Sequence, residues 1–522
     1  MKVIGKIRLL RLAGILIILS VLAGGCAAED GTAKDDGSGI YTSLAELSGK
    51  RIGVQMGSIF DEVILDRVPD AEILYYNSFP DEVTALEANK IDGLPTLKMI
   101  FSQFQQETHA KYAMIDEPIY SVPLAYLFPK NEEGLHLQKQ MDEFLIGLGK
   151  RGELGKLQEK WQAADEADRV IEDYRSLPDI NGTLTFVTEG TFPPFNYVRD
   201  DMVVGYDVDV AALFCKAYGY ALQVQTMTFD ALMPAVQAGK CDFAASGIAI
   251  TEERKENVYF SRPNIEGDVV IMVKKKADAG GAGAFFTSIR ESFEKTFIRE
   301  HRYRLFLQGI VVTMIITALS IVFGTLLGFG AYMWCRTGGR FADAVTRFCV
   351  WIVQGLPVVV LLMLLYYVVF GKTSLNGMWV AVVGFTLTFG SAVYGMLRSG
   401  VNAVESGQTE AAYALGFSDR QTFFGIILPQ AAQFFMPAYK GEIVTLIKAT
   451  AIVGYIAVQD LTKMGDIIRS RTYEAFFPLI AVAVIYFILA GILTMIVSRI
   501  TFSIDPKKRT KEQILKGVRI DD

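Results

Sequence analysis

Few residues in this sequence have the types and spacing that catalysis or metal binding requires. The three histidines, His109, His136 and His301, lie far apart in the chain and predict no metal site. No G-x-x-x-x-G-K-[ST] segment occurs, so no ATP site is predicted within the chain itself. Cys215 and Cys241 occupy core-like positions and are expected to be free buried thiols. We therefore expect neither an enzyme nor a bound cofactor.

The distribution of charge divides the chain into two unlike parts. The 522 residues carry a net charge of −6, which argues against a nucleic-acid-binding protein. With 51% hydrophobic residues, the chain is not expected to be disordered. Beyond residue 304, uncharged runs of about 24 residues or more are each long enough to cross a bilayer core of about 30 Å. These runs are Leu305–Cys335, Phe348–Gly371, Thr373–Leu397 and Ala475–Ser498.

A fifth stretch, Ile443–Val458, carries only Lys448, and we therefore predict five membrane spans. Lys448 either has an intramembrane function or reaches the membrane interface with its long side chain. Residues 1–304 instead show the short apolar strands and amphipathic helices of a soluble protein. The glycine-rich stretch Ala279–Ala284 predicts a linker, placed at 277–304, between the two parts.

The N-terminus has the pattern of an export signal. Basic residues precede the apolar run Leu12–Leu22, and small residues then lead to Cys26. A cysteine in this place resembles that of a bacterial lipoprotein signal, which implies cleavage after residue 25, lipidation of Cys26 and contact with membrane lipid. An uncleaved membrane anchor is the alternative. Either version of the signal, assigned to residues 1–26, exports the domain that follows.

Loop charges predict the orientation of the spans. With residues 27–304 outside, the loop after the first span is cytoplasmic, and it carries Arg336, Arg340 and Arg347. The tail at 503–522 also contains a basic cluster and falls inside. Because cytoplasmic loops are enriched in Lys and Arg, the expected location is a bacterial cytoplasmic membrane, with the N-terminal domain extracellular or periplasmic.

One cytoplasmic loop has a distinctive sequence. It begins Glu410-Ala-Ala-Tyr-Ala-Leu-Gly416 and continues to Leu428-Pro429. This segment resembles the EAA loop of ABC importer permeases for polar amino acids, and the resemblance covers 305–502. It implies an all-α polytopic membrane domain with two helices in the loop, the second ending at Leu-Pro. It also implies a separate cytoplasmic ATPase subunit as partner and a second permease copy, as a homodimer. The residues expected to couple to the ATPase are Glu410, Ala411, Ala412 and Gly416.

The exported part contains five short motifs in a specific order. They are Thr188-Glu-Gly-Thr-Phe-Pro-Pro-Phe195, Gly205-Tyr-Asp-Val-Asp209, Phe229-Asp-Ala-Leu-Met-Pro234, Gly239-Lys-Cys-Asp242 and Ser246-Gly-Ile-Ala-Ile-Thr-Glu-Glu-Arg254. Together they make residues 181–276 resemble lobe one of family 3 solute-binding proteins for polar amino acids. Residues 43–165 resemble lobe two and the closing helix of the same fold. The expected fold class is an α/β two-lobed periplasmic-binding-protein-like domain followed by the membrane domain.

The two lobes occur in reversed order along the chain. Their combined length is close to that of one binding protein, and neither segment duplicates the other. We therefore predict one circularly permuted domain, since the termini of a domain often lie close together on its surface. Two truncated domains, each needing a partner, are the alternative.

The resemblance implies a solute site between the lobes. Arg254 matches the carboxylate clamp, and a guanidinium suits bidentate contact with a carboxylate. Leu97 stands where the family has an aspartate for the ammonium group, so either another acid such as Glu189 substitutes or the ligand is not a standard α-amino acid. The expected solute-binding residues are Glu189, Phe192, Phe229, Ser246, Gly247, Ala249, Arg254, Gln55, Gly57 and Ser58.

The expected function is that of an ABC importer subunit that both captures a solute and conducts it across the membrane. Polar amino acids or related carboxylate-bearing solutes are the expected cargo. The alternative is a ligand-gated receptor or channel that uses the same binding fold. Such channels contain a TVGYG-like filter, which this sequence lacks.

Overall fold

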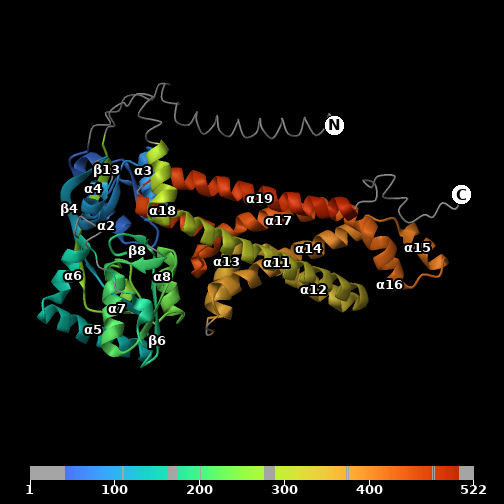
Figure 1. The fold of residues 1–522 in the computed structure, drawn as a ribbon, viewed down its shortest axis with the longest axis horizontal. Helices are drawn as coiled ribbons and strands as arrows, with labels where there is room; N and C mark the ends of the chain where they lie inside the picture. The colour runs from blue at the N-terminus through green and yellow to red at the C-terminus, as the bar shows by residue number, and fades with distance from the viewer. Residues whose placement is uncertain are drawn as a thin grey trace, which may run out of the picture.

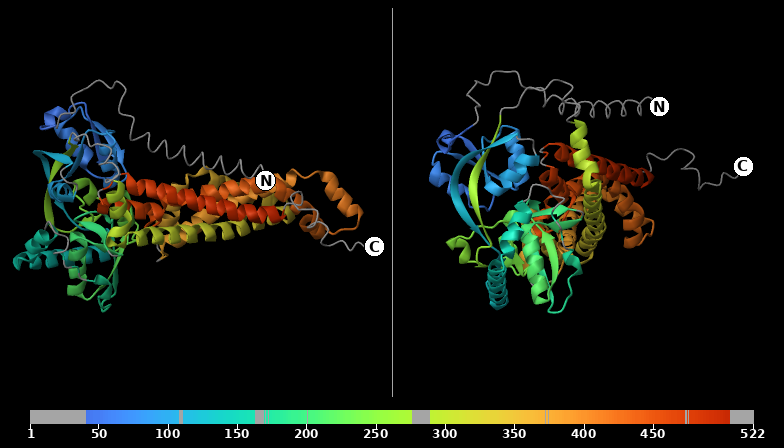
Figure 2. Two further views of the ribbon diagram at one scale, coloured as in Figure 1. Left: turned by 45° about the horizontal axis from the view of Figure 1, so that its top comes forward. Right: turned by 60° about the vertical axis from the view of Figure 1, so that its left-hand side comes forward.

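The computed structural model describes residues 41–107, 111–162, 169, 171, 173–199, 201–275, 289–371, 373, 375–472, 474 and 476–504. The predicted signal with Cys26, the glycine-rich stretch and the basic tail lie outside the described residues. A two-lobed α/β domain sits at one end of an elongated bundle of helices (Figure 1). The views in Figure 2 show the same separation of an α/β head from a helical stem.

Lobe two is built on a mixed sheet with the strand order β2-β1-β3-β13-β4, in which a bridge between Ile52 and Gly93 joins β1 to β3. Strands β1 and β3 are buried along almost their whole length and form a core with the flanking helices. Its elements are β1 (Arg51–Gln55), α2 (Phe60–Arg67), β2 (Glu72–Tyr76), α3 (Phe79–Glu87), β3 (Leu94–Leu97), α4 (Lys98–Glu107), β4 (Tyr112–Leu124) and β13 (Ile265–Lys274).

Lobe one has a five-stranded sheet in the order β10-β6-β11-β5-β12, in which β10, β6 and β11 are parallel and β5 runs antiparallel to both of its neighbours, β11 and β12. A small antiparallel sheet, β7-β8-β9, lies beside it. The strands are β5 (Leu127–Phe128), β6 (Thr183–Thr188), β7 (Thr191–Phe192), β8 (Asn196–Arg199), β9 (Met202–Val204), β10 (Ala221–Thr226), β11 (Phe243–Ala244) and β12 (Tyr259–Phe260). The helices are α5 (Glu132–Lys150), α6 (Glu153–Gln162), α7 (Tyr206–Tyr218), α8 (Phe229–Gln237) and α9 (Glu252–Lys255).

The two sequence segments interleave in space. Strand β5 from the first segment pairs with β11 and β12 of the second, whereas β13 from the second pairs with β3 and β4 of the first. The closing helices α5 and α6 pack on α7, with the rings of Phe144 and Phe214 5.8 Å apart. In addition, Trp161 Nε1 donates to Asp209 at 2.9 Å. Each lobe therefore contains chain from both segments.

Within the described residues, three uninterrupted helices are long and apolar enough to cross a membrane: α11 (Tyr303–Thr337), α14 (Gly377–Asn402) and α19 (Phe477–Ile504). Two further candidates are bent. In the first, α12 (Gly339–Gly355) and the segment Val358–Val369, which begins with α13 (Val358–Met363), meet at 108°. In the second, Asp419–Ile456 and α18 (Leu461–Thr472) meet at 60°. Counting each bent pair as one span gives the predicted number of five.

Two details differ from the sequence-based expectation. The second helix of the cytoplasmic loop does not end at Leu428-Pro429. Instead, the helix that begins at Asp419 continues through Leu428-Pro429 into α17 (Leu428–Ala449), with a π-helical turn, Phe423–Ile427, directly before the proline. The stretch Ile443–Val458, which was expected to be one continuous span, is therefore the end of α17 followed by a 3₁₀ turn, Thr450–Ile456. Lys448 lies exposed in the last turn of α17.

Helix α18 has no counterpart in the sequence analysis, which assigned no element to residues 461–472. It packs against α11 and α19 on one side and against α3, β7 and β8 on the other. Its basic side chains Lys463, Arg469 and Arg471 are all buried. Thus α18 joins the helical stem to both lobes.

The glycines Gly324 and Gly328, whose spacing suggested either close packing or ordinary membrane-helix glycines, lie in the contact between α11 and α14. A Cβ on Gly328 would stand 2.5 Å from the Gly390 carbonyl oxygen and 2.8 Å from Val393 Cβ. The spacing therefore serves close helix packing.

Replacement of Gly328 by leucine is expected to force α11 and α14 apart. Overpacking of this kind costs about 1–3 kcal/mol or more, which lowers the melting temperature of the detergent-solubilised chain. The matched control is Gly330→Leu on an exposed position of the same helix, where a Cβ would meet no atom within 4 Å. Equal melting temperatures for the two variants would contradict the packing role of Gly328.

Candidate functional site

Residues from both lobes converge on one small cavity of about 30 Å³. Of the ten expected solute-binding residues, eight line it, together with Leu97, the residue that stands in place of the family's aspartate. A volume of this size holds about one water molecule, so the lobes must separate before an amino acid can enter. The eight are Gln55, Ser58, Phe192, Phe229, Ser246, Gly247, Ala249 and Arg254.

The guanidinium of Arg254 bridges the lobes. It is presented by the short helix α9, whose N-cap residue Thr251 accepts a hydrogen bond from the Arg254 backbone N–H at 3.2 Å. Arg254 Nη1 donates to the Ala249 carbonyl at 2.9 Å, and Nη2 donates to the carbonyl of Gly57 in lobe two at 2.7 Å. Burial lowers the pKa of Arg254 from its usual value, while nearby acidic groups oppose that shift. Arg254 is thus a half-buried cation at the junction that closes over the cavity.

Glu189 lies at the end of β6, next to the cavity rather than in its wall. Only 1% of its surface is exposed, and its Oε1 accepts a hydrogen bond from Gln55 Nε2 at 3.0 Å. Its Oε2 has no hydrogen-bond partner among the described residues. Burial raises the pKa of Glu189, and the charge of Lys463 on α18 lowers it. The contact with Gln55 is a second polar link between the lobes.

The aromatic residues provide an apolar wall. The Phe192 ring stacks on Phe195 at a centroid distance of 5.7 Å and meets Phe79 of lobe two edge-to-face at 6.0 Å. Phe229 begins α8, and a Cβ on Gly57 would stand 3.9 Å from its Cδ1 atom. Both rings therefore sit where the lobes meet, as flat apolar surfaces beside the polar groups.

A buried network of polar groups lies behind the residues that line the cavity. It includes Asp207, which belongs to one of the sequence motifs but was not among the predicted site residues. Asp207 Oδ2 accepts hydrogen bonds from the Gly247 backbone N–H at 3.3 Å and from Asn196 Nδ2 at 3.4 Å. Asn196 Nδ2 also donates to Ser246 Oγ at 3.0 Å. The network fixes the Ser246–Gly247 turn, and burial raises the pKa of Asp207 to about 7.

This raised pKa predicts a pH dependence of stability. The unfolded chain releases the Asp207 proton near its ordinary pKa of about 4, whereas the folded chain retains it to about pH 7. Stability therefore falls as pH rises between those values, by about 4 kcal/mol at most. We expect Asp207→Asn to show a smaller loss of melting temperature between pH 5 and pH 8. The exposed Asp268→Asn control should behave like the wild type, and an unchanged loss in Asp207→Asn would contradict the assignment.

The predicted coupling residues lie at the opposite end of the molecule, where α15 (Ser406–Ala414) and α16 (Asp419–Thr422) cap the helical stem (Figure 1). Glu410 and Ala411 are exposed, whereas Ala412 is buried. Gly416 follows the helix with a φ of +82°. Exposed apolar side chains surround this turn: Tyr413, Leu415 and Phe417.

The loop is tied to the stem by Arg336. Its guanidinium forms an ion pair with Asp419 and lies 4.3 Å from the centroid of the Phe423 ring. Tyr413 Oη donates to the same Asp419 carboxylate at 2.9 Å. Because Arg336 is in the last turn of α11, these contacts join the loop directly to the first membrane helix.

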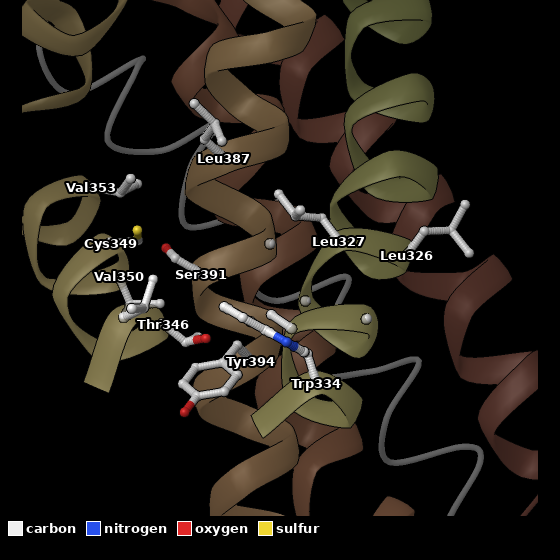
Figure 3. Close-up of a pocket in the computed structure, with 15 residues that line it drawn as sticks. Leu326, Leu327, Trp334, Thr346, Cys349, Val350, Val353, Leu387, Ser391 and Tyr394 are labelled. Atoms are coloured by element: carbon white, nitrogen blue, oxygen red, sulfur yellow. The ribbon is translucent and has the colours of Figure 1, made fainter. Parts of the chain in front are cut away.

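A larger cavity of about 500 Å³ lies in the membrane half between α11, α12 and α14 (Figure 3). Its lining is mostly apolar, with the hydroxyls of Thr346, Ser391 and Tyr394 among the leucines and valines. It lacks the charged groups that a zwitterionic solute needs. In a bilayer, a surface of this kind is covered by acyl chains or by another helix.

The comparisons with known proteins agree with both halves of the structure. The family of bacterial extracellular solute-binding proteins, family 3, matches residues 184–450. The arginine transport system permease protein ArtQ of Bacillus subtilis is 33% identical over 195 residues, which is 36% of this chain and 88% of that protein. The putative glutamine transport system permease protein GlnP of Rickettsia bellii is 32% identical over 199 residues, with the same shares.

Among solved structures, a crystal structure of an amino acid ABC transporter with histidines is 26% identical, with a TM-score of 0.36, over 43% of this chain and 98% of that one. The fold and the site define a two-lobed binding domain joined to a polytopic membrane domain. The chain belongs to the family 3 bacterial extracellular solute-binding proteins and to the amino-acid ABC transporter permeases.

Proposed function

We propose that this chain captures an amino acid, or a related carboxylate-bearing solute, outside the cell and conducts it through the membrane as a subunit of an ABC importer. The observation that supports this most is the joining of a two-lobed site to a permease through α18, which contacts both lobes. The arginine and glutamine systems named among the relatives make those two amino acids the first solutes to test. Solute bound between the lobes would be released where the lobes meet the stem.

The interleaved sheets support the proposal that the exported segments form one circularly permuted domain. The sheet of each lobe is completed by a strand from the other sequence segment, β5 in lobe one and β13 in lobe two. The resulting domain would bind the solute carboxylate through Arg254 and the backbone N–H groups near Gly57 and Ser58. Phe192 and Phe229 would enclose the apolar part of the solute.

The partners in this proposal are a cytoplasmic ATPase subunit and a second copy of this chain. The ATPase would bind the cap formed by α15 and α16, whose exposed apolar residues suit a protein interface. The lipidated Cys26 would provide a further membrane attachment. Native mass spectrometry of the complex purified from membranes tests both the ATPase and the homodimer.

Transport into proteoliposomes tests the function as a whole. The full chain, reconstituted with its ATPase subunit, is expected to accumulate radiolabelled arginine or glutamine only when ATP is supplied on the ATPase side. Solute-evoked ion current without ATP would instead favour the receptor or channel alternative. Failure of every standard amino acid and of related carboxylates to bind the purified chain would contradict the proposal.

The exposed Leu415 provides a specific test of the ATPase contact. Its side chain is 78% exposed, so Leu415→Glu should leave the fold of the chain intact while placing a charge in the apolar interface. We expect the ATPase to be lost on co-purification, with amino-acid binding unchanged. Arg420→Gln, at an exposed position in α16, is the control and should retain the ATPase. Full retention by Leu415→Glu would place the interface elsewhere.

A further inference from the structure

The cavity of about 500 Å³ in the membrane half has no part in the solute site. It lies between α11, α12 and α14, and no charged residue lines it. Leu326 and Trp334 in its wall are 64% and 46% exposed, so the cavity opens onto the surface of the helical stem. On α12, the lining residues from Thr346 to Val353 recur at helical spacing and form one face of the helix. The cavity is therefore a groove on the membrane-facing side of the stem.

The lining of this groove changes from apolar to polar along its length. Leu387 and Val353 lie at one end (Figure 3). Thr346, Tyr394 and Trp334 lie at the other end. Tyrosine and tryptophan favour the level of the lipid headgroups, because part of each side chain is apolar and part is polar. The groove thus has the polarity of an amphiphile, with its polar end beside the last turn of α11.

Charged residues begin directly beyond the polar end. Arg398 Nη1 donates to Tyr394 Oη and to Asp343 Oδ1, both at 3.1 Å. Arg347, one turn after Asp343 on α12, forms an ion pair with the same carboxylate. Among the described residues, these two guanidinium groups share one carboxylate, and the side chains of Arg347 and Arg398 remain 61% and 39% exposed. The mouth of the groove therefore carries an excess of positive charge.

The length of the groove matches one leaflet of a membrane. The residues of α11 that line it extend from Leu326 to Trp334, which is about 12 Å at a helical rise of about 1.5 Å per residue. One leaflet is half of a hydrocarbon core of about 30 Å, or about 15 Å. With its polar end at the headgroups, the groove lies within a single leaflet. In the predicted orientation of the spans, this is the cytoplasmic leaflet.

We propose that this groove binds an anionic phospholipid, with an acyl chain along the apolar wall and the phosphate at Arg347 and Arg398. The ligand differs from the transported solute, so the inference goes beyond the proposed function. Basic pockets between membrane helices at the cytoplasmic surface suit anionic headgroups. Thr346 is only 6% exposed, and its hydroxyl has no hydrogen-bond partner in the described part of the chain. A headgroup oxygen supplies that partner.

The charges at the mouth favour a lipid over a second copy of this chain. In a two-fold dimer formed through the groove, the same patch of both chains lies in the interface. The arginines of both mouths would then enter one interface, where like charges repel. A lipid phosphate instead neutralises the excess charge of each mouth separately.

Native mass spectrometry of the full chain tests the selectivity for the headgroup. The lipid-depleted chain in detergent is offered dioleoyl phosphatidylglycerol or dioleoyl phosphatidylcholine at equal concentration. We expect one phosphatidylglycerol to be retained in preference, and Arg347→Gln and Arg398→Gln each to weaken its retention about fivefold, as for one basic residue beside an anionic lipid. The control Arg420→Gln, which removes an exposed cation from α16, should retain the lipid. Equal retention of both lipids, or full retention by both arginine variants, would overturn the site.

Cys349→Phe tests the position of the acyl chain while leaving every charge in place. Cys349 is exposed and lines the groove, so a phenyl ring there occupies space that the acyl chain needs. We expect the retention of phosphatidylglycerol to fall severalfold. The matched control is Ala344→Phe, which places the same ring on an exposed position of α12 outside the groove. Equal retention by these two variants would contradict the placement of the chain.

Tryptophan fluorescence in bilayers distinguishes a lipid from a second copy of the chain. When the exposed Trp351 and Trp379 are replaced by phenylalanine, Trp334 is the tryptophan that remains in the membrane half. We expect phosphatidylglycerol with brominated acyl chains to quench it at a low mole fraction in phosphatidylcholine, at which brominated phosphatidylcholine does not. No quenching by either lipid would mean that protein covers the groove and would overturn the proposal. Amino-acid binding and transport by the same variant would still test the importer separately.

Discussion

Replacement of Arg254 by methionine is expected to weaken amino-acid binding by about 100-fold, because its guanidinium lines the cavity and is the cation proposed to pair with the solute carboxylate. Methionine retains much of the apolar stem of arginine and removes its hydrogen-bond donors. The two bonds to the Ala249 and Gly57 carbonyls are lost as well, so closure of the lobes should be weakened. Calorimetry on the full chain in nanodiscs measures the affinity.

The matched control is Arg262→Met, which removes an exposed guanidinium from the same lobe. It should bind solute as the wild type does. Arg254→Lys separates charge from geometry, since lysine keeps the charge without the planar fork. An intermediate affinity is expected for it. Wild-type affinity in Arg254→Met would show that the solute carboxylate is bound elsewhere.

Replacement of Arg469 by methionine is expected to detach lobe two from the stem and to abolish transport while solute binding persists. Arg469 Nη1 donates to Asp81 at 2.8 Å and to Asp466 at 2.9 Å, and Nη2 donates to the Pro80 carbonyl at 2.7 Å and to Thr84 Oγ1. Its side chain is only 4% exposed. Breaking a buried ion pair by removing one partner costs about 3–5 kcal/mol, which is large for a contact between two parts of a chain.

Distance measurements between spin labels on lobe two and on α11 test this expectation. The wild type should give one narrow distance distribution and Arg469→Met a broad one. Arg299→Met is the control, since this exposed arginine lies near the same junction. An unchanged distribution together with normal transport in Arg469→Met would show that α18 does not hold lobe two.

Much of the solute site could be predicted from the sequence because its residues lie in short, ordered motifs. Eight of the ten expected residues line one cavity, Gly57 contributes a carbonyl to Arg254, and Glu189 reaches the cavity through Gln55. Their roles in binding stay predictions. The candidate membrane spans could likewise be predicted from the uncharged runs, because the hydrocarbon core of a bilayer disfavours charged residues over its thickness of about 30 Å.

The remaining features depend on contacts between distant segments. Residues 461–472 contain Lys463, Asp466 and Arg469, and by sequence they resemble an exposed polar loop. They become a buried helix only because lobe two and the stem supply partners for their charges. The bend between Gly355 and Val358 was not predicted, although Gly355 and Pro357 are the helix-breaking residues that mark it in the sequence.

The order of the lobes determines how the binding domain is attached to the stem. The described chain enters the domain through β1 and leaves it through β13, and both strands belong to the lobe two sheet. Lobe two is therefore joined toward α11 through the chain itself and is held by Arg469. Lobe one meets the stem through non-covalent contacts, since Gln459 Nε2 donates to Thr226 Oγ1 at 2.9 Å and Lys240 Nζ donates to the Phe370 carbonyl. If lobe two stays in place, separation of the lobes must break these contacts, so opening of the cavity is linked mechanically to the stem.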